Sequence, residues 1–425
     1  MNKHILVITY YWPPSGGAGV QRWLKFCKYL PNFGMQPIVL TVDEHQASYP
    51  QRDDSLLEEV SNDLRVVKTK TKEVLRFYRH LSPTGELPHT GFGNEKHPTL
   101  LQKISRFIRG NFFLPDPRRG WNKYAYKEAC HLIEEENITT VITTSPPHST
   151  QLIGLRLKRQ YPHIKWVADL RDPWTDIYYN KDLYQTIFAK LYNARLERKV
   201  LESADEVITV SEECRRNFES KTHQTLAIQV IPNGYDETDF LPEESSKKTD
   251  KFILSYVGSL SPLYETKTFI AALQQLPQAV KDKIKLRFVG SAHADLASLL
   301  NQVGIETEWL GYAEHKKAIG YMQEADMLLL FLPNQPENKG ILTGKLFEYM
   351  ATGKPILMIG FGDGDAAQLL RKYEEDGIYE FGQATQVSQF IARSLTTLPS
   401  IHTDFAQIFS RQQLTKQLAQ LLPSV

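Results

Sequence analysis

The chain has 425 residues, 41% of them hydrophobic, and 50 Lys and Arg balance 49 Asp and Glu to a net charge of +1. This length provides for two or three domains with ample cores, and the charge balance argues against a protein that binds nucleic acid. Cys27, Cys130 and Cys214 are widely spaced, which favours small buried residues over a disulfide framework or a metal site. Because no run reaches the roughly 20 apolar residues of a membrane span, we expect a cytoplasmic protein.

The first half of the chain alternates strand-like and helix-like segments. Strands are predicted at 5–9, 36–41, 141–144, 166–169, 206–210 and 229–231, with helices at 20–30, 123–135 and 184–203. The short apolar stretch at the start is predicted to be a strand and not a signal peptide. This alternation predicts a parallel sheet that is covered by helices on both faces.

The alternation stops at a polar segment, 243–250, and then starts again. Strands are predicted at 252–257, 285–289, 308–310, 327–331 and 355–358, and residues 404–422 have apolar residues at helical spacing. We therefore expect an α/β protein of two Rossmann-like domains, 1–245 and 250–400, followed by a helical segment at 401–425.

Residues 81–122 lack this rhythm and contain five prolines. Within them, 101–110 has the pattern of an amphipathic helix, and basic and aromatic residues follow. The candidates for contact with an anionic membrane surface or a phosphorylated acceptor are Arg106, Arg109, Arg118, Arg119 and Trp121. The alternative is a helix that packs on its own domain with its basic residues in solvent.

Glycines at Gly16, Gly17 and Gly19 follow the first strand and precede a helix. Glycine allows a sharp turn that brings backbone N–H groups close to a ligand. The spacing matches neither the dinucleotide pattern nor a P-loop. A phosphate-binding turn and an ordinary tight turn both remain open.

Polar residues follow two other strands of the first half. His148 comes after the strand at 141–144, and Asp169, Arg171 and Asp172 end or follow the next strand. Ligand groups gather at the carboxyl ends of parallel strands, so these four residues are candidates for catalysis. The alternatives are a histidine that bonds its own loop and an internal Arg–Asp pair that fixes the loop.

The most informative segment, 343–356, follows the apolar strand at 327–331. Thr343 and Gly344 make a turn, Lys345 adds a charge at the start of a helix, and Glu348 lies one turn further along. Unpaired N–H groups at a helix start attract phosphate, and a carboxylate accepts hydrogen bonds from the two hydroxyls of a ribose. The segment indicates a nucleotide site, although an ordinary surface helix is the alternative.

The same segment resembles the donor-binding motif of retaining glycosyltransferases of family 4, which have the GT-B fold. Glu348 matches the second glutamate of that motif, whereas Gly340 stands where the family has the first, which contacts the sugar. The resemblance extends over the whole chain. It includes the segments 143–149, 169–174, 203–212, 231–236 and 256–260, of which the last opens the second domain with Gly258.

The resemblance implies two Rossmann-like domains facing a cleft, with the C-terminal helix crossing back to the first. It also implies that Gly16, Gly17, Gly19 and Gly258 help to hold donor phosphate, and that nucleotide-base contacts begin at Gly311. The family often has an arginine where this chain has Ser259, and Lys267 is a possible substitute.

The implied function is transfer of a sugar from a nucleotide-sugar to a glycan or lipid-linked acceptor of cell-envelope polysaccharide synthesis. Anomeric configuration would be retained, and no cofactor or metal would be required. Contact with the inner face of the cytoplasmic membrane would be peripheral. The alternatives are a sugar-nucleotide epimerase of GT-B shape and a non-catalytic nucleotide-sugar binder, which the missing first glutamate leaves open.

Overall fold

The computed structural model describes residues 3–72, 99–240, 249–260, 262–292 and 294–422. The chain divides into two compact units, residues 1–232 with 414–425 and residues 233–413. The boundary at Pro232 and Asn233 thus lies earlier in the chain than the predicted one near 245. Residues 243–248 of the predicted linker, 243–250, lie outside the described residues, as do residues 81–98 of the predicted insertion.

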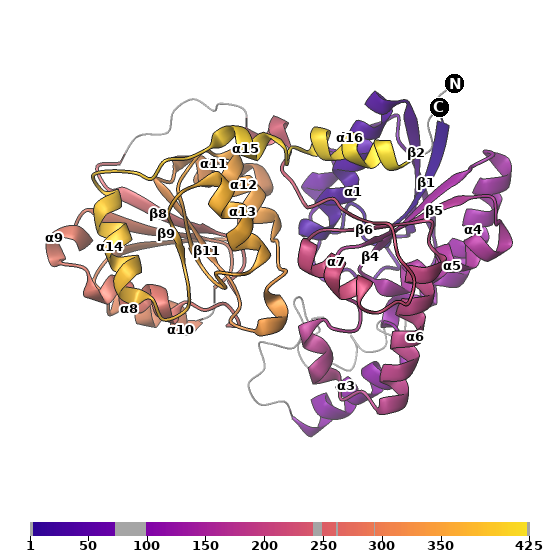
Figure 1. The fold of residues 1–425 in the computed structure, drawn as a ribbon, viewed down its shortest axis with the longest axis horizontal. Helices are drawn as coiled ribbons and strands as arrows, with labels where there is room; N and C mark the ends of the chain where they lie inside the picture. Colours follow the sequence, from indigo (N-terminus) through magenta and orange to yellow (C-terminus); the bar gives the residue numbers. More distant parts are fainter. Residues whose placement is uncertain (1–2, 73–98, 241–248, 261, 293, 423–425) are drawn as a thin grey trace. The chain divides into compact units, whose positions relative to one another are not determined.

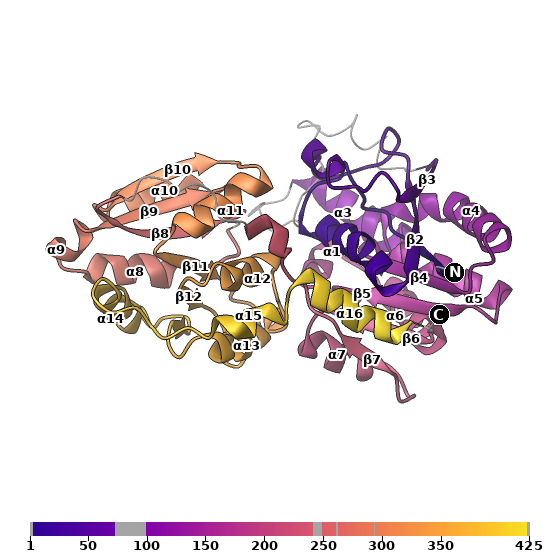
Figure 2. The ribbon, with the colours of Figure 1, turned by 90° about the horizontal axis from the view of Figure 1, so that it is seen from above.

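The first unit is built on a parallel sheet (Figures 1 and 2). Among its described residues, seven strands are ordered β3-β2-β1-β4-β5-β6-β7. The strands are β1 (Lys3–Ile8), β2 (Met35–Val42), β3 (Arg65–Thr69), β4 (Thr140–Ser145), β5 (Lys165–Leu170), β6 (Glu206–Thr209) and β7 (Ile228–Val230). The helices are α1 (Ala18–Tyr29), α3 (Leu100–Phe112), α4 (Asn122–Glu135), α5 (Gln151–Gln160), α6 (Ile187–Ser203) and α7 (Glu212–Glu219), with short 3-10 turns that include η3 (Pro117–Trp121), η4 (His148–Thr150) and η5 (Tyr178–Leu183).

Each face of this sheet packs against helices because its strands alternate their side chains between two cores. In β1, Ile5 and Val7 join the core beneath α1, whereas Leu6 and Ile8 join the core beneath α4 and α5. The last helix, α16 (Arg411–Leu421), contributes Leu414 and Leu418 to the core beneath α1. The end of the chain therefore packs in the first unit.

The second unit repeats this plan (Figure 2). Its described residues form a parallel sheet of six strands in the order β10-β9-β8-β11-β12-β13. The strands are β8 (Phe252–Val257), β9 (Ile284–Val289), β10 (Glu306–Gly311), β11 (Met327–Phe331), β12 (Ile356–Ile359) and β13 (Ile378–Tyr379). The helices are α8 (Lys267–Gln275), α9 (Gln278–Lys281), α10 (Ala294–Asn301), α11 (His315–Glu324), α12 (Gly344–Ala351), α13 (Asp365–Tyr373), α14 (Ala384–Ser394) and α15 (Thr403–Gln407), with the 3-10 turn η6 (Glu237–Phe240) before β8.

The predicted α/β fold with two Rossmann-like sheets is confirmed, and each predicted strand has its counterpart. Two strands, β3 and β13, were not predicted. The predicted helix at 404–422 is instead two helices, α15 and α16, because the chain turns at 408–410. None of the three cysteines forms a disulfide; Cys27 and Cys214 are buried, as expected, whereas Cys130 is half-buried. No helix among the described residues is long and apolar enough to cross a membrane.

Candidate functional site

Strand order in the first sheet reverses between β1 and β4, and such reversals mark ligand sites at the carboxyl ends of the strands. The loop after β1 leads into α1, which begins after Gly17, where φ is 95°. Gly16 is tied to a neighbouring loop, because its N–H donates to the Gln51 carbonyl over 3.0 Å. No described side chain caps α1, so the N–H groups of its first turn can donate hydrogen bonds to an anion.

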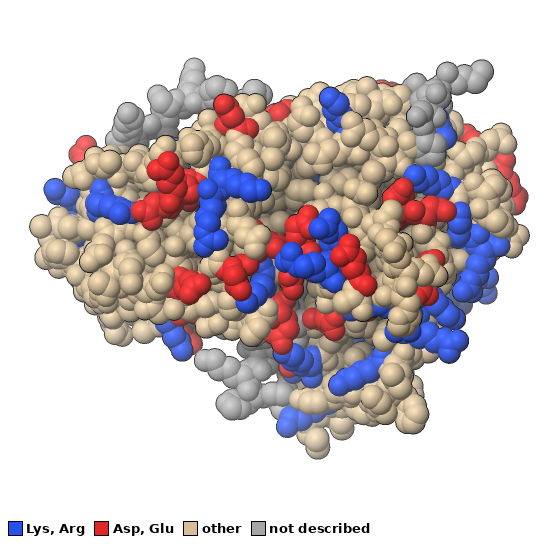
Figure 3. All heavy atoms as spheres, in the orientation of Figure 1, with Lys and Arg blue, Asp and Glu red and all other residues tan. Residues whose placement is uncertain are grey.

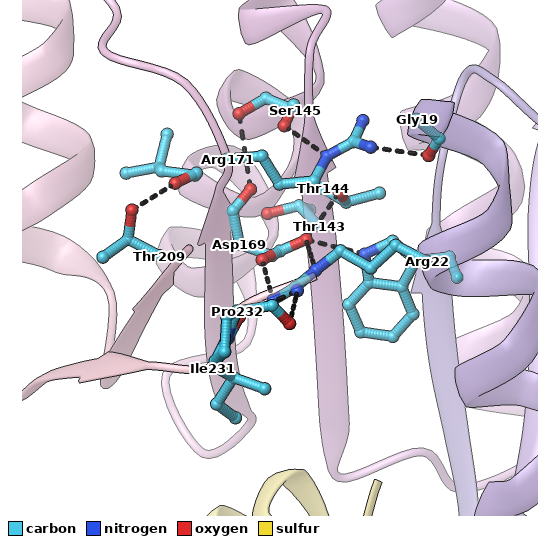
Figure 4. A network of polar contacts seen from close by, with 12 residues as sticks. Gly19, Arg22, Thr143, Thr144, Ser145, Asp169, Arg171, Thr209, Ile231 and Pro232 are labelled. Atoms are coloured by element: carbon cyan, nitrogen blue, oxygen red, sulfur yellow. Dashed lines mark hydrogen bonds and ion pairs between the residues drawn. The ribbon is translucent and has the colours of Figure 1, made fainter. Parts of the chain in front are cut away.

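Asp169, at the end of β5, is fully buried in a complete set of partners (Figure 4). Its carboxylate pairs with the fully buried Arg22 at 3.1 Å and accepts hydrogen bonds from Trp23 Nε1 at 2.7 Å and Thr144 Oγ1 at 2.8 Å. Arg22 also donates to the Ile231 and Pro232 carbonyls. The carboxylate therefore ties α1 to β4 and β5, and a catalytic role for Asp169 stays a prediction.

Arg171 fastens the same loops together. Its guanidinium donates to the carbonyls of Ser145 at 2.9 Å and Gly19 at 2.5 Å (Figure 4). A Cβ on Gly19 would lie 3.1 Å from Arg171 Nη1, so a glycine permits this close approach. Burial lowers the pKa of Arg171, whose hydrogen-bond partners among the described residues are all main-chain oxygens. Arg171 thus positions the glycine loop beside the end of β4.

His148 is a buried side chain of this unit whose ring stacks on an aromatic neighbour. Its ring is 7% exposed and stacks on Trp174 with the centroids 5.0 Å apart and the planes 9° from parallel. Neither ring nitrogen has a hydrogen-bond partner among the described residues. Burial lowers the pKa of His148 to about 3, so the ring is neutral at physiological pH. A buried polar ring without partners indicates a ligand that supplies them.

Asp172 and Tyr11 lie close to Arg171. The half-buried Asp172 makes no hydrogen bond or ion pair with another described residue, and burial raises the pKa of its carboxyl. Tyr11 interacts electrostatically with Arg171 and was not predicted. Tyr11 lies in an apolar stretch after β1, and nothing in that local sequence indicates a contact with Arg171.

The predicted basic and aromatic surface is divided by the fold. Trp121 is fully buried and donates to Thr69 Oγ1 at 2.8 Å, and Arg106 is only 4% exposed, so neither is available to a membrane. Arg118 is half-buried, donates to the Ser48 carbonyl and lies over the ring of Tyr11. The prediction is wrong for Arg106 and Trp121.

Two other members of that set keep some exposure. Arg119 is exposed and donates to the Leu114 carbonyl at 2.8 Å, whereas Arg109 is half-buried near the end of α3. Asp116, which precedes η3, accepts hydrogen bonds from the N–H and hydroxyl of Ser149. This part of the predicted insertion is thus anchored to the His148 loop.

In the second unit the strand order reverses between β8 and β11, and Lys345 lies beside the end of β8. Its Nζ donates to Tyr256 Oη at 2.6 Å and lies 4.3 Å and 5.5 Å from the ring centroids of Tyr256 and Tyr264. Burial lowers the pKa of Lys345 to about 8. Gly258 has φ 129°, and a Cβ there would lie 2.9 Å from Nζ. The ammonium group therefore lies against the glycine turn after β8.

Glu348 follows one helical turn later on α12. The half-buried carboxylate makes no hydrogen bond with another described residue, and burial raises its pKa. His315 and Arg411 act electrostatically on it in the opposite direction, and His315 Nε2 lies 3.2 Å from Asp239 Oδ2. Sequence reasoning missed these neighbours, which come from segments far apart in the chain.

The remaining predicted donor residues are placed differently. Thr343 is the N-cap residue of α12, and its buried hydroxyl has no partner among the described residues, whereas Gly344 is the first residue of the helix. Gly311 ends β10 in an exposed position with φ 64°. Lys267 is exposed at the start of α8, and no contact with the Lys345 cluster is found for it. The structure thus gathers Thr343, Gly344, Lys345, Glu348 and Gly258, but not Lys267.

Within the described ranges, no group of three or more His, Cys, Asp or Glu residues could hold a metal ion. The charged groups available to an anion at these sites are those of Lys345 and the helix starts.

Two family models match the chain. Residues 16–239 match Glycosyltransferase Family 4, and residues 237–396 match Glycosyl transferases group 1. The two matched ranges meet near the boundary between the units, and together they include the His148 loop and the Lys345 site.

Known proteins agree with these matches. TuaH of Bacillus subtilis (strain 168), provisionally described as a teichuronic acid biosynthesis glycosyltransferase, is 21% identical over 240 residues, which are 53% of this chain and 56% of TuaH. The crystal structure of Anabaena HepE with UDP and glucose has a TM-score of 0.64 at 16% identity and covers 100% of both chains. Sucrose-phosphate synthase from Thermosynechococcus elongatus has a TM-score of 0.64 at 15% identity, over 99% of this chain and 98% of its own. With more than half of its residues matched by one family model, the chain belongs to glycosyltransferase family 4.

Proposed function

We propose that this protein transfers a sugar from a nucleoside-diphosphate sugar to a glycan or lipid-linked acceptor of cell-envelope polysaccharide synthesis. The observation that carries the proposal is the pair formed by Lys345 and Glu348. The half-buried Lys345 places its ammonium group at the start of α12, and a carboxylate without a hydrogen-bond partner among the described residues follows one turn later. This spacing suits a diphosphate and its ribose.

The donor's charge would be met by three features of the second unit. Lys345 carries a positive charge below about pH 8, the N–H groups at the start of α12 point outward from the helix, and Gly258 keeps the adjacent turn free of a side chain. Such groups stabilise the negative charge that develops on a departing diphosphate. We infer that the reaction needs no metal ion and proceeds with retention of anomeric configuration.

His148 would serve the acceptor and the reacting sugar. Because its pKa is about 3, it acts as a neutral ring that can donate one hydrogen bond and accept another. It is not an acid at neutral pH. Hydroxyl groups of a sugar would satisfy both of its ring nitrogens, and the carboxyl of Asp172, which interacts electrostatically with Arg171, would accept from a further hydroxyl.

The relatives suggest a donor and a pathway. Anabaena HepE has been crystallised with UDP-glucose, and TuaH is provisionally assigned to teichuronic acid biosynthesis. We therefore propose a UDP-sugar as donor and a cell-envelope glycan as acceptor, on a protein in peripheral contact with the membrane. Gly340 in place of the family's first glutamate removes one sugar contact, so the phosphate and ribose contacts would contribute most of the donor affinity.

A panel of UDP-, GDP- and ADP-sugars, each with and without membrane lipid extract or oligosaccharide acceptors, tests the proposal. Nucleoside diphosphate released only when an acceptor is present, with a labelled product, supports transfer. A changed sugar-nucleotide without acceptor would indicate epimerisation instead. Binding in a thermal-shift screen without turnover on any acceptor would indicate a nucleotide-sugar binder.

A further inference from the structure

Exposed apolar side chains are concentrated on one part of the first unit. Eleven of the large hydrophobic residues that are exposed lie on α3, at the end of η5 or on the start of α6. They are Leu100, Leu101, Ile104, Phe107, Ile108, Phe112, Tyr184, Ile187, Phe188, Leu191 and Tyr192. We call this set the α3–α6 face. Contiguous apolar surface of this kind marks a site of interaction.

At this face, helix α6 exposes apolar residues and buries polar ones, the reverse of a usual surface helix. Phe188 is 81% exposed and Leu191 62%, whereas Asn193 and Glu197 are almost completely buried. Asn193 accepts a hydrogen bond from Trp174 Nε1, and Glu197 pairs with Lys221. The polar residues are thus used inside the unit, and the apolar residues point out of it.

Helix α3 shows the same reversal. Arg106 is 4% exposed, whereas Leu101 is 79% exposed and Phe112 71%. A helix that only packed on its own domain would turn these apolar residues inward. The two helices therefore present their apolar sides outward.

The two helices are held together as one surface. Asn111 Nδ2 donates to the Tyr184 carbonyl at 3.1 Å, and its Oδ1 accepts from the Thr186 N–H at 2.8 Å. Gly110 lets the chains approach, because a Cβ there would lie 2.3 Å from the Leu183 carbonyl oxygen. The face is a fixed feature of the fold and does not depend on one loose helix.

Charge on the α3–α6 face has one sign. Neither α3 nor the first ten residues of α6 contain Asp or Glu, whereas Lys103, Lys190 and Arg195 are exposed among the apolar residues. In Figure 3, the lower projection, where Figure 1 places α3, is mostly tan with blue side chains on it. Apolar residues flanked by basic ones match the boundary between acyl chains and anionic headgroups.

We propose that the α3–α6 face docks this protein on an anionic lipid bilayer. Phe188, Leu191 and Phe107 enter the headgroup region, and the basic residues bind the lipid phosphates. A second copy of the chain fits this face less well, because a two-fold contact would place Lys103, Lys190 and Arg195 against their own copies. The docking proposal rests on the peripheral membrane contact proposed above and names the face that makes it, and it does not depend on which sugar is transferred.

Co-sedimentation with lipid vesicles tests the proposal without donor or acceptor. The full chain should bind vesicles that contain phosphatidylglycerol and bind pure phosphatidylcholine weakly, and binding should fall from about 0.05 M to about 0.5 M NaCl as charges are screened. Phe188→Ser/Leu191→Ser should reduce binding at least about tenfold, given the apolar area removed. Lys190→Gln/Arg195→Gln should abolish most of the preference for anionic vesicles.

Matched controls separate this face from the rest of the surface. Leu57→Ser/Leu398→Ser removes two other exposed leucines, and Lys283→Gln/Lys317→Gln removes two other exposed lysines. Both controls should bind like the wild type, and circular dichroism should be unchanged in all four variants. Absence of vesicle binding, or equal binding by Phe188→Ser/Leu191→Ser, would overturn the proposal. A wild-type dimer that this variant dissociates would assign the face to a second copy.

Discussion

Two carboxylates near the carboxyl ends of parallel strands differ in their burial and in their hydrogen bonds. Asp169 in the first unit is fully buried and saturated by Arg22, Trp23 and Thr144. Glu348 in the second unit is half-buried and has no hydrogen-bond partner among the described residues. Position at a strand end or helix start therefore does not distinguish a structural acid from a binding one; the hydrogen bonds do.

The largest expected effect is on stability and comes from replacing Asp169, whose carboxylate has a full set of hydrogen-bond partners. Asp169→Ala leaves the buried guanidinium of Arg22 without its counter-ion and should destabilise the protein by about 3–5 kcal/mol. Urea unfolding measures this loss. Glu348→Ala is the control and should change the free energy of unfolding by less than about 1 kcal/mol. Similar losses in both variants would contradict the distinction between the two acids.

A third carboxylate, Glu374, extends the comparison to a site where no ligand is expected. It is fully buried where β12 begins, accepts one hydrogen bond from the Ile356 N–H, and has a second oxygen without a partner among the described residues. Burial raises its pKa to about 9. The folded protein thus holds this proton more tightly than the unfolded chain.

Stability should therefore decrease as pH rises from the unfolded pKa near 4.5 towards 9. At pH 7 the cost is on the order of 3 kcal/mol. Glu374→Gln keeps an acceptor for Ile356 and stays neutral, so its stability relative to the wild type should increase between pH 5 and pH 8. Melting temperatures measured across this range check the sign. A constant difference between the two proteins would mean that Glu374 does not titrate there.

Replacement of Glu348, the carboxylate proposed to bind the ribose, should affect ligand affinity more than stability. Glu348→Ala should weaken nucleoside-diphosphate binding by roughly 1–3 kcal/mol, the scale of a charge-assisted hydrogen bond. Isothermal titration calorimetry with UDP and GDP measures it. The affinity of the Asp169→Ala variant, where it stays folded, should change less. Unchanged affinity in Glu348→Ala would remove this residue from the donor site.

Sequence reasoning predicted the sheets well and the site in part. Buried strands such as β8 and β11 are continuous apolar runs, and these are recognisable without tertiary contacts. The missed strands lack that signal, because β3 is partly exposed and β13 has two residues. Lys345 and Glu348 were found because one short segment contains both.

The role of Asp169 could not be predicted in the same way. Its partner Arg22 is 147 residues away in sequence, and the lysine of the second site meets Tyr256 across 89 residues. The burial of Arg106 and Trp121 likewise depends on long-range packing. A local sequence pattern shows which charged and aromatic side chains are present, but it does not show whether they are exposed.

His148 extends the comparison to a neutral group of the first unit. His148→Ala should lower turnover by about tenfold or more and leave donor affinity nearly unchanged, because its ring would contact the reacting sugar or acceptor. Steady-state kinetics with the donor found by the panel, together with calorimetry, separate the two effects. His148→Gln, which keeps polar atoms in the space of the ring, should retain more activity than alanine. Full activity in His148→Ala would leave the ring as a packing partner of Trp174.

The smallest expected effect is a pH dependence of diphosphate affinity through Lys345. Its pKa of about 8 in the free protein should rise when a diphosphate binds, because the anion favours the protonated amine. Binding is then linked to proton uptake. Affinity for UDP should fall as pH rises above about 8, by less than about tenfold per pH unit.

Lys345→Ala should remove this pH dependence and weaken UDP more than uridine, since only UDP carries the diphosphate. Glu348→Ala is the matched variant and should keep the pH dependence, because the ribose contact would carry no titrating cation. Calorimetry between pH 6 and pH 9 measures both. A flat profile in the wild type, or equal losses for UDP and uridine in Lys345→Ala, would place the ammonium group away from the phosphates.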